Sequence, residues 1–256
     1  RLYIHDLRHD LRLPLPVDLI GWGLDAAWSP DGRSVAFTTF QPDEVRRDVY
    51  TYTLPRGPLR RVSSSALADH NSPSWSPDGR YLAYQAIDSA AATGWDVYIH
   101  DLEHDTYEAV YVTPGMDGLP AWSPDGQRLA FVGLEAESET YAILLLDIAN
   151  GEVTSLLGLA EASFNVPLAW SPDGSALVFS APLAFRNVNL YRIEIASGEM
   201  RQLTSDSGGA TEPDWSPDGR RIAFTSYRPQ GVVLRIYTID ANGGDMTLIT
   251  PGTADY

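Results

Sequence analysis

The sequence predicts an all-β protein, a β-propeller built of four-stranded antiparallel blades. The first observation is a five-residue stretch, Trp-Ser-Pro-Asp-Gly, which occurs five times at a spacing of 45 to 48 residues. The second is that two apolar, strand-like segments follow each copy, separated by a loop. A regular period of this size indicates repeated units that bury their apolar faces by stacking on one another. The five tryptophans are Trp28, Trp75, Trp122, Trp170 and Trp215.

Each Trp-Ser-Pro-Asp-Gly stretch has the chemistry of a tight turn between the first and second strands of a repeat. The serine accepts a hydrogen bond from the turn backbone, the proline presets φ, and the glycine supplies a positive φ. The second strand follows directly, as in residues 34–40 and 81–86. We expect the tryptophan that ends each first strand to pack in the core against a neighbouring blade.

The third and fourth strands form a second hairpin in every repeat. Residues 2–7 and 97–102 share the pattern Tyr-Ile-His-Asp-Leu, and related segments recur in the other repeats. A turn follows each of them, most clearly at Asn150-Gly151 and Asn242-Gly243, because Asn-Gly between apolar runs is a strong hairpin signal. One repeat is therefore a meander of four antiparallel strands.

The two kinds of turn differ in number. There are five Trp-Ser-Pro-Asp-Gly turns but six turns between third and fourth strands. We therefore expect one domain over 1–256, with a partial blade over 1–20 and five full repeats over 21–256. Residues 250–256 resemble 113–118, which lead into a first strand. This predicts a six-bladed ring with one blade incomplete, its missing hairpin supplied by residues before or after this sequence or by another chain. The alternative is a closed five-bladed ring with a loose hairpin.

The composition narrows the classes of partner. The net charge is −16, from 18 basic and 34 acidic residues, so nucleic acid and anionic lipid are poor partners, and a basic protein surface or cations are better ones. The absence of cysteine excludes disulfides, thiolate metal sites and a cysteine nucleophile. No apolar run reaches the roughly 20 residues of a membrane helix, so we expect no direct membrane insertion.

The sequence carries no recognisable catalytic motif. Gly-x-Ser-x-Gly, His-Glu-x-x-His and Walker-type loops are all missing, and we expect neither a catalytic residue nor a cofactor within these residues. His5 and His9 are four residues apart, as are His100 and His104. Because these pairs lie on strands and turns, their rings do not converge, and we expect no metal site.

The candidate partner-binding face lies opposite the Trp-Ser-Pro-Asp-Gly turns. Acidic residues in the loops that enter each first strand predict an acidic funnel for a cation or a basic segment, although ordinary solvated loops are the alternative. Aromatic residues and an arginine in the loops between second and third strands are typical of interface anchors, although Trp95 and Phe185 could equally cover blade edges. The candidates are Asp25, Asp69, His70, Asp117, Glu161, Glu212, Asp214, Trp95, Phe185, Tyr227 and Arg228.

The repeat resembles the TolB-type, WD40-like β-propeller family. The pattern is Pro-x-Trp-Ser-Pro-Asp-Gly, an Ala-Phe strand, an Ile-Tyr strand ending in Asp, and a Leu-Thr end, seen best in residues 119–131 and 212–226. Departures at Leu168, Ser175 and Ala26 are mild, and the match covers essentially the whole chain. The resemblance implies a propeller and a periplasmic or extracellular home in a bacterium, and it does not imply an enzyme.

Two functions follow from this resemblance. The first is a non-catalytic protein–protein interaction or scaffolding domain of a larger protein or complex. The alternative is the substrate-gating propeller of a prolyl-oligopeptidase-like serine peptidase whose catalytic domain lies outside this chain. A third interpretation is a propeller that binds a small molecule or metal in its channel. Because one fold hosts many functions, the resemblance alone does not choose among them.

Overall fold

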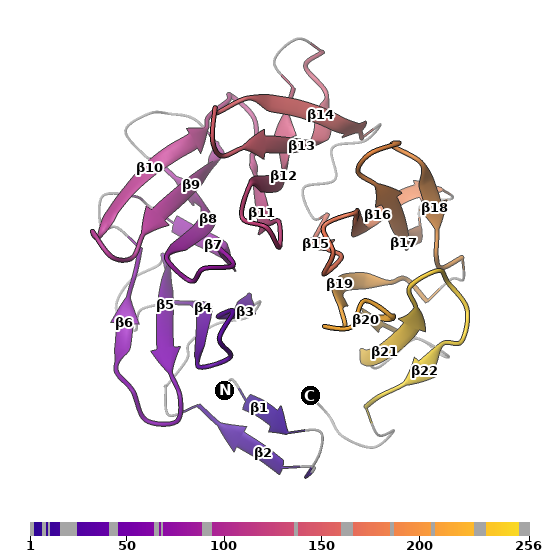
Figure 1. The fold of residues 1–256 in the computed structure, drawn as a ribbon, viewed down its shortest axis with the longest axis horizontal. Coiled ribbons are helices and arrows are strands. Elements are labelled where there is room, and N and C mark those ends of the chain that lie inside the picture. The colour runs from indigo at the N-terminus through magenta and orange to yellow at the C-terminus, as the bar shows by residue number, and fades with distance from the viewer. Residues whose placement is uncertain are drawn as a thin grey trace.

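In the described part of the chain, five four-stranded antiparallel sheets and one two-stranded sheet stand around a common centre (Figure 1). The first strand of each four-stranded sheet lies nearest the centre, and the fourth lies outermost. No helix in the described part of the chain is long and apolar enough to span a membrane. The computed structural model describes residues 3–6, 9, 11–15, 25–40, 46–63, 67, 69–88, 94–135, 138–159, 166–184, 187–205, 208–227 and 234–250.

Every blade is a meander whose strands pair in chain order. The two-stranded sheet contains β1 (Tyr3–Asp6) and β2 (Leu11–Pro14). The first blade contains β3 (Ala26–Trp28), β4 (Ser34–Phe40), β5 (Arg47–Thr53) and β6 (Leu59–Arg61). The second contains β7 (Asp69–Trp75), β8 (Tyr81–Ile87), β9 (Trp95–Asp101) and β10 (Thr106–Tyr111).

The remaining three blades repeat this order. The third contains β11 (Gly118–Trp122), β12 (Arg128–Leu134), β13 (Tyr141–Asp147) and β14 (Val153–Gly158). The fourth contains β15 (Leu168–Trp170), β16 (Ala176–Ala184), β17 (Asn187–Glu194) and β18 (Met200–Gln202). The fifth contains β19 (Thr211–Trp215), β20 (Arg221–Ser226), β21 (Arg235–Asp240) and β22 (Thr247–Leu248).

The turn between the first and second strands is built as its sequence predicts. In the first blade the Ser29 hydroxyl donates to Asp31 Oδ1 at 2.6 Å and accepts from the Ser34 backbone N–H at 2.8 Å. Gly32 has a φ of +66°, a conformation that glycine adopts without strain. The serine hydrogen bond to Asp31 is the main cause of its lowered pKa. The same bond, with the same effect on the pKa, recurs at Asp78, Asp125, Asp173 and Asp218.

Three of the tryptophans hydrogen-bond to the preceding blade, whereas the indole N–H of Trp122 is buried without a partner among the described residues. The indole N–H groups of Trp75, Trp170 and Trp215 donate to the carbonyls of Ala27, Ala121 and Ala169, each one residue before the tryptophan of the preceding blade. Such bonds satisfy a donor that packing would otherwise leave buried without a partner.

Trp28 departs from the core role expected of it. The side chains of Trp122, Trp170 and Trp215 keep 8 or 9% of their surface exposed, whereas Trp28 keeps 51%. The physical reason is its neighbour, since no four-stranded blade precedes Trp28 in the described part of the chain.

The described residues form five four-stranded blades, whereas the sequence predicted six blades with one of them incomplete. At the additional position the described residues supply only β1 and β2, which lie between the first and fifth blades (Figure 1). This small sheet packs Ile4 and Leu15 against Phe37 and Tyr50 of the first blade. Two strands therefore cover part of a surface that a whole blade covers elsewhere in the ring.

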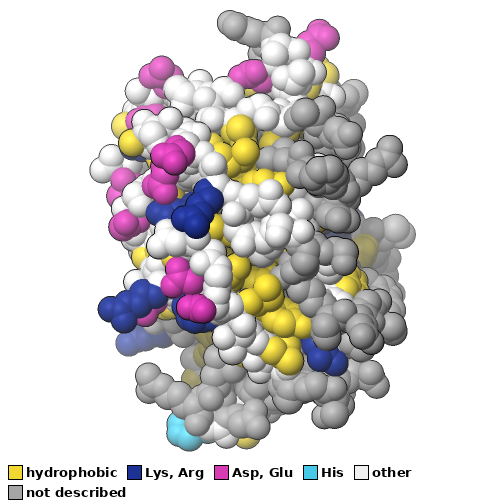
Figure 2. Space-filling view, turned by 90° about the vertical axis from the view of Figure 1, so that its right-hand side faces the viewer, with side chains coloured by type: hydrophobic (Ala, Val, Ile, Leu, Met, Phe, Trp, Pro, Cys, Tyr) yellow, Lys and Arg dark blue, Asp and Glu magenta, His cyan; other side chains and the backbone are white. Residues whose placement is uncertain are grey.

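The outermost strands expose apolar side chains. On the side seen in Figure 2, apolar groups reach the surface among acidic and basic ones. The exposed residues of the fourth and fifth blades include Met200, Met246 and Leu248, with between 40 and 42% of their surface accessible. Fourth strands cover only one neighbour, so their outer edges are less buried than the second and third strands.

Candidate partner-binding site

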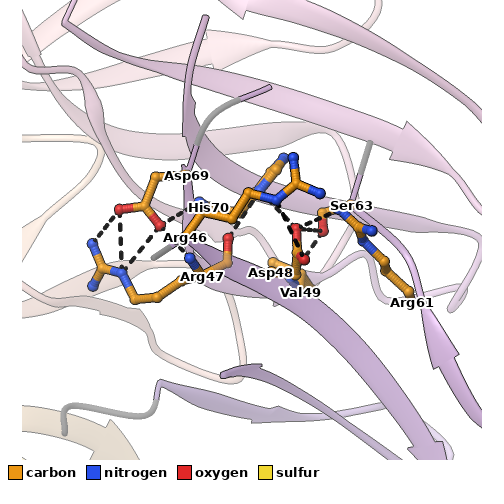
Figure 3. A network of polar contacts seen from close by, with 8 residues as sticks. All are labelled: Arg46, Arg47, Asp48, Val49, Arg61, Ser63, Asp69 and His70. Carbon is orange, nitrogen blue, oxygen red and sulfur yellow. Dashed lines mark hydrogen bonds and ion pairs between the residues drawn. The ribbon is translucent and has the colours of Figure 1, made fainter. Parts of the chain in front are cut away.

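A salt bridge joins the first two blades on the face that carries the loops into each first strand (Figure 3). Arg47 opens β5 and Asp69 opens β7, so both lie at strand ends. Arg47 Nη2 is 2.9 Å from Asp69 Oδ2, Arg47 Nε is 3.2 Å from Oδ1, and the Arg47 backbone N–H also donates to Oδ1 at 2.8 Å. About a quarter of each side chain is exposed, at 23% and 24%. This bidentate pairing fixes the plane of the guanidinium.

Two aromatic rings flank the guanidinium of Arg47. Its central carbon lies 5.5 Å from the ring centre of Trp95 and 6.0 Å from that of Phe40. A planar cation is attracted to the negative faces of aromatic rings. The side chains of Arg47, Trp95 and Phe40, together with Asp69, form what we call the Arg47 cluster.

The buried residue Asp48 lies next to Arg47 in β5 and forms a second polar network. Asp48 and His70 have no exposed surface. Asp48 Oδ1 accepts from the Ser63 hydroxyl and from Arg61 Nη2, both at 2.9 Å, and lies 3.4 Å from His70 Nδ1. Burial raises the pKa of Asp48, but the hydrogen bonds from His70 and Ser63 and the charge of Arg61 outweigh it, so the net pKa is lowered.

These groups do not form a nucleophilic triad. A triad needs the histidine between the serine and the acid, so that the histidine takes the serine proton. Here Ser63 and His70 both contact Asp48, and the Ser63 hydroxyl accepts from the Val49 backbone N–H at 3.1 Å. The arrangement is suited to holding the strand ends in place.

His70 was predicted to contact a partner, but its side chain is buried. Its ring is buried, lies edge-on to Tyr84 at 5.6 Å between ring centres, and places Nδ1 3.2 Å from the Arg47 carbonyl. A side chain with no exposed surface does not touch a partner, so His70 acts through the backbone of Arg47. The sequence placed it at the surface because its neighbours in the loop are polar.

Asp117 is also misplaced, since it is buried and not on a funnel wall. It accepts hydrogen bonds from the Thr113 hydroxyl at 2.7 Å and the Leu134 backbone N–H at 2.8 Å, and its own N–H donates to the Trp95 carbonyl at 2.6 Å. Burial raises the pKa of Asp117 to about 6. Asp117 therefore helps to fix the position of Trp95.

A small cavity lies between Trp95 and Asp117. Its volume is about 20 Å³, and Gln85, Met116 and Leu119 contribute to its walls. This is close to the space that one water molecule needs. The cavity is too small for an organic ligand, and among its lining residues Met116 is exposed while Trp95 is partly buried.

The other predicted acids in the described residues accept hydrogen bonds from nearby strands. Asp25 Oδ2 accepts from both the N–H and the hydroxyl of Ser72, each at 3.1 Å, and so links the first two blades. Glu212 is exposed and accepts from the Thr225 hydroxyl at 3.1 Å. Asp214 is exposed on the innermost strand β19, yet desolvation by surrounding protein raises its pKa. Asp25 therefore bonds the neighbouring blade, whereas Glu212 and Asp214 bond residues of their own blade.

Among the predicted aromatic and arginine contacts, Tyr227 is half exposed, at 50%. It lies in the loop after β20, far along the chain from the Arg47 cluster. Glu161, Phe185 and Arg228 lie outside the described residues. The structure thus brings Asp69, Trp95 and, behind them, His70 and Asp117 into one region.

Two features escaped the sequence reasoning. One is Arg47, whose only signal was the Arg46-Arg47 pair directly before a strand. The other is the turn face, where a hollow of about 450 Å³ lies between the turns of the first two blades, lined in part by Asp31 and Asp78. Their lowered pKa values keep both carboxylates ionised, so this face also carries negative charge.

The closest approach to a metal site in the described residues is at the turn after β9. Asp101, Glu103 and His104 bring one ligand atom each within 4.8 Å of one another. Arg80 Nη2 already lies 2.7 Å from Asp101 Oδ2, and Arg80 Nε lies 3.5 Å from Glu103. The guanidinium supplies the positive charge there, so the group is explained as a surface ion-pair network.

Comparison with known proteins places this chain in a family. The family described as TolB beta propeller domain matches residues 65–183 and 161–256. Dipeptidyl-peptidase 5 of Porphyromonas gingivalis is 29% identical over 186 residues, covering 70% of this chain and 20% of that protein. The Tol-Pal system protein TolB of Alcanivorax borkumensis is 38% identical over 60 residues, covering 23% of this chain and 13% of that protein. The chain therefore spans a small part of these relatives.

A solved structure supports the same fold. TolB from Acinetobacter baumannii superposes with a TM-score of 0.73 at 23% identity, over 88% of this chain and 54% of that one. Identity at this level shows the fold alone. Together with the family match over residues 65–183 and 161–256, it leads to one conclusion. This chain belongs to the TolB β-propeller domain family.

Proposed function

We propose that this chain is a non-catalytic, protein-binding propeller domain and that the Arg47 cluster anchors its partner. The observation that carries the proposal is the guanidinium of Arg47, which lies over the rings of Trp95 and Phe40 and pairs with Asp69. Tryptophan and arginine are enriched at the energetic centres of protein interfaces. Side chains that are already fixed lose less entropy on binding, which favours affinity.

The partner we propose is a protein with a basic surface. The chain carries a net charge of −16, so its overall field attracts a basic surface. Opposite charges steer encounter and raise association rates, and salt weakens this effect. Association is therefore expected to slow as ionic strength rises.

A six-position ring is part of the same proposal. Its support is the packing of β1 and β2 against the first blade through Ile4 and Leu15, on the face that blades use elsewhere to stack. Residues 2–7 also share the third-strand pattern of 97–102. In this proposal the small sheet is the outer half of a sixth blade.

A second candidate function is favoured by one observation. The 29% identity to dipeptidyl-peptidase 5 extends over 70% of this chain. In this alternative the propeller gates access to the catalytic domain of a serine peptidase, and that domain lies outside these residues. Peptidase activity in the complete gene product, lost on mutation of a serine outside residues 1–256, would favour the alternative. Under either function, we place the protein in the periplasm or outside the cell, as the family resemblance implies.

Affinity capture with matched variants tests the first candidate. Wild-type protein, Trp95→Ala and Tyr227→Ala are immobilised, and proteins retained from bacterial envelope extract are quantified by mass spectrometry. Tyr227, a predicted contact that the proposed anchor leaves out, is the control because it is an exposed aromatic of the fifth blade, whereas the Arg47 cluster joins the first two blades. We expect Trp95→Ala to lose a protein that wild type and Tyr227→Ala retain. Equal retention by all three proteins contradicts the proposed anchor.

A further inference from the structure

A hollow on the turn face lies between the first two blades, and Trp75 forms one of its walls. Its volume is about 450 Å³, within the range of ligand pockets in proteins. Ser34 and the turn acids Asp31 and Asp78 line it as well. Ser34 begins β4, whereas Arg47 pairs with the last residue of that strand. The hollow and the Arg47 cluster therefore lie at opposite ends of the first blade.

The tryptophans of the later blades are covered more completely than Trp75. Trp75 is only partly buried, whereas Trp122, Trp170 and Trp215 are buried. The preceding blade offers two equivalent positions beside each of these tryptophans. One is the first residue of its second strand. The other is the third-strand residue that pairs with the third residue of that second strand.

The second and fourth blades show how a side chain at these positions covers the next tryptophan. Tyr81, at the first position, stacks on Trp122 with ring centres 6.3 Å apart and planes inclined by 25°. Arg192, at the second position, places its guanidinium carbon 5.6 Å from the ring centre of Trp215. The same guanidinium pairs with Glu194 at 2.9 Å. An arginine held over a tryptophan and paired with an acid is therefore already part of this fold.

The first blade carries small side chains at both positions. The third blade fills the second position with Leu145, which shares a core cluster with Trp170. In the first blade Ser34 and Thr51 occupy the two positions. Neither side chain is large enough to cover an indole ring, so one face of Trp75 borders the hollow instead of a neighbouring side chain.

Two exposed carboxylates complete the wall of the hollow. A serine hydrogen bond is the main cause of the lowered pKa of Asp31 and of Asp78, so both are ionised at neutral pH. Arg33 and Arg80 carry charge near these acids, but neither lines the hollow, and Arg80 already pairs with Asp101 at 2.7 Å. An aromatic face bordered by carboxylates is the chemistry that attracts an organic cation.

We propose that this hollow binds an arginine side chain presented by a partner protein. The guanidinium lies over Trp75 as that of Arg192 lies over Trp215, and Asp31 and Asp78 accept its N–H groups. Arginine fits better than lysine, because its planar group stacks on an aromatic ring and donates two parallel hydrogen bonds. The inference goes beyond the proposed anchor, since the hollow shares no residue with it and lies at the other end of the blade.

The probe is the peptide Gly-Gly-Arg-Gly-Gly, capped at both ends and titrated into the whole chain. Binding is followed by the indole N–H signal of Trp75 in a two-dimensional NMR spectrum, and the signal that disappears in Trp75→Phe identifies it. The control peptide carries citrulline, which keeps the shape of arginine without its charge. We expect the arginine peptide to shift the signal saturably with millimolar affinity, and the citrulline peptide to bind about tenfold or more weakly.

Variants of the protein test the hollow itself. Ser34→Tyr and Thr51→Arg give the first blade the covering side chains of the second and fourth blades, and each should weaken binding of the arginine peptide about tenfold or more. Asp31→Asn removes a charge but keeps a hydrogen-bond acceptor, and it should weaken binding about threefold. Asp218→Asn makes the same change in the turn of the fifth blade and should bind as wild type does.

The hollow is excluded as an arginine site by any one of these results. No shift of the Trp75 signal at millimolar arginine peptide, or equal binding of the citrulline peptide, shows that no guanidinium is recognised there. Wild-type affinity in Ser34→Tyr or Thr51→Arg, in whichever variant is folded by circular dichroism, places the peptide elsewhere. An equal loss in Asp31→Asn and Asp218→Asn shows that overall negative charge, and not the hollow, attracts the peptide.

Discussion

Arg47 and Asp69 form a bidentate salt bridge between the first two blades, with Nη2 2.9 Å from Oδ2 and Nε 3.2 Å from Oδ1. The acid also accepts the backbone N–H of the same arginine at 2.8 Å. One carboxylate therefore fixes both the start of β5 and the guanidinium that stacks on Trp95. The salt bridge that joins the two blades therefore also positions the proposed binding anchor.

Removing the acid should weaken the fold modestly. Asp69→Ala leaves the Arg47 side chain partly exposed and able to find water, so we expect a loss of about 1–2 kcal/mol in the free energy of unfolding. Urea denaturation followed by circular dichroism measures it. Glu199→Ala, in an exposed turn, is the control and should change the free energy by less than about 0.5 kcal/mol. An equal loss of unfolding free energy in the two variants would contradict a structural role for this salt bridge.

Removing the buried acid should be far more damaging. Asp48→Ala leaves Arg61 and His70 without their carboxylate. The position is buried, since Asp48 has no exposed surface. The side chain of Arg61 is 31% exposed and can reach water, so the loss comes from the buried donors of Ser63 and His70, at about 1–3 kcal/mol each. Asp48→Asn keeps an acceptor for Ser63 and should cost less. A loss under about 1 kcal/mol for Asp48→Ala would contradict the support role.

The raised pKa of Asp117 predicts that its contribution to folding stability falls as pH rises. Burial raises its pKa from 3.8 to about 6, so folding disfavours its charged form. Between these values the folded state binds more protons than the unfolded state, and stability falls as pH rises. The contribution is at most about 3 kcal/mol and is absent in Asp117→Asn.

The measurement for Asp117 is the difference in unfolding free energy between wild type and Asp117→Asn as a function of pH. We expect the difference to shift against wild type from pH 3.8 to about pH 6 and to level off above. Asp48, with its lowered pKa, works in the opposite direction, because its stabilisation is lost as pH falls below its ordinary value of 3.8. A flat difference would mean that Asp117 reaches solvent.

The tryptophans should separate into two classes. Trp215→Ala removes a side chain that is 9% exposed and an indole bonded to Ala169, and it should cost about 3–5 kcal/mol. Trp28→Ala removes one that is 51% exposed and should cost under about 1.5 kcal/mol. Thermal unfolding of the two variants compares them. Similar losses would show that Trp28 is packed as the others are.

The sequence predicted the blades well because their signals are local. A Ser-Pro-Asp-Gly turn is specified by its own residues, and strands expected at 34–40 and 97–102 are observed at Ser34–Phe40 and Trp95–Asp101. The exposure of Trp28 was not predicted, since a tryptophan in a repeated motif gives no sign of whether a neighbour is present to cover it.

The site was predicted only in part because its contacts are not local. Asp69 and Trp95 were named from their loops, but Arg47 is 22 residues from Asp69 in the chain, and their pairing depends on how two blades stack. His70 and Asp117 were expected at the surface because polar loop residues usually are. Both are buried because each bonds the backbone or an acid of a neighbouring strand.

The binding proposal depends most directly on Arg47. The measurement is the equilibrium affinity of the captured partner for wild type, Arg47→Ala and Tyr227→Ala by surface plasmon resonance at physiological salt. We predict that Arg47→Ala weakens binding by about tenfold or more, since it removes a fixed cation and frees Trp95, and that Tyr227→Ala binds as wild type does. Equal affinity of all three proteins would contradict the proposed anchor.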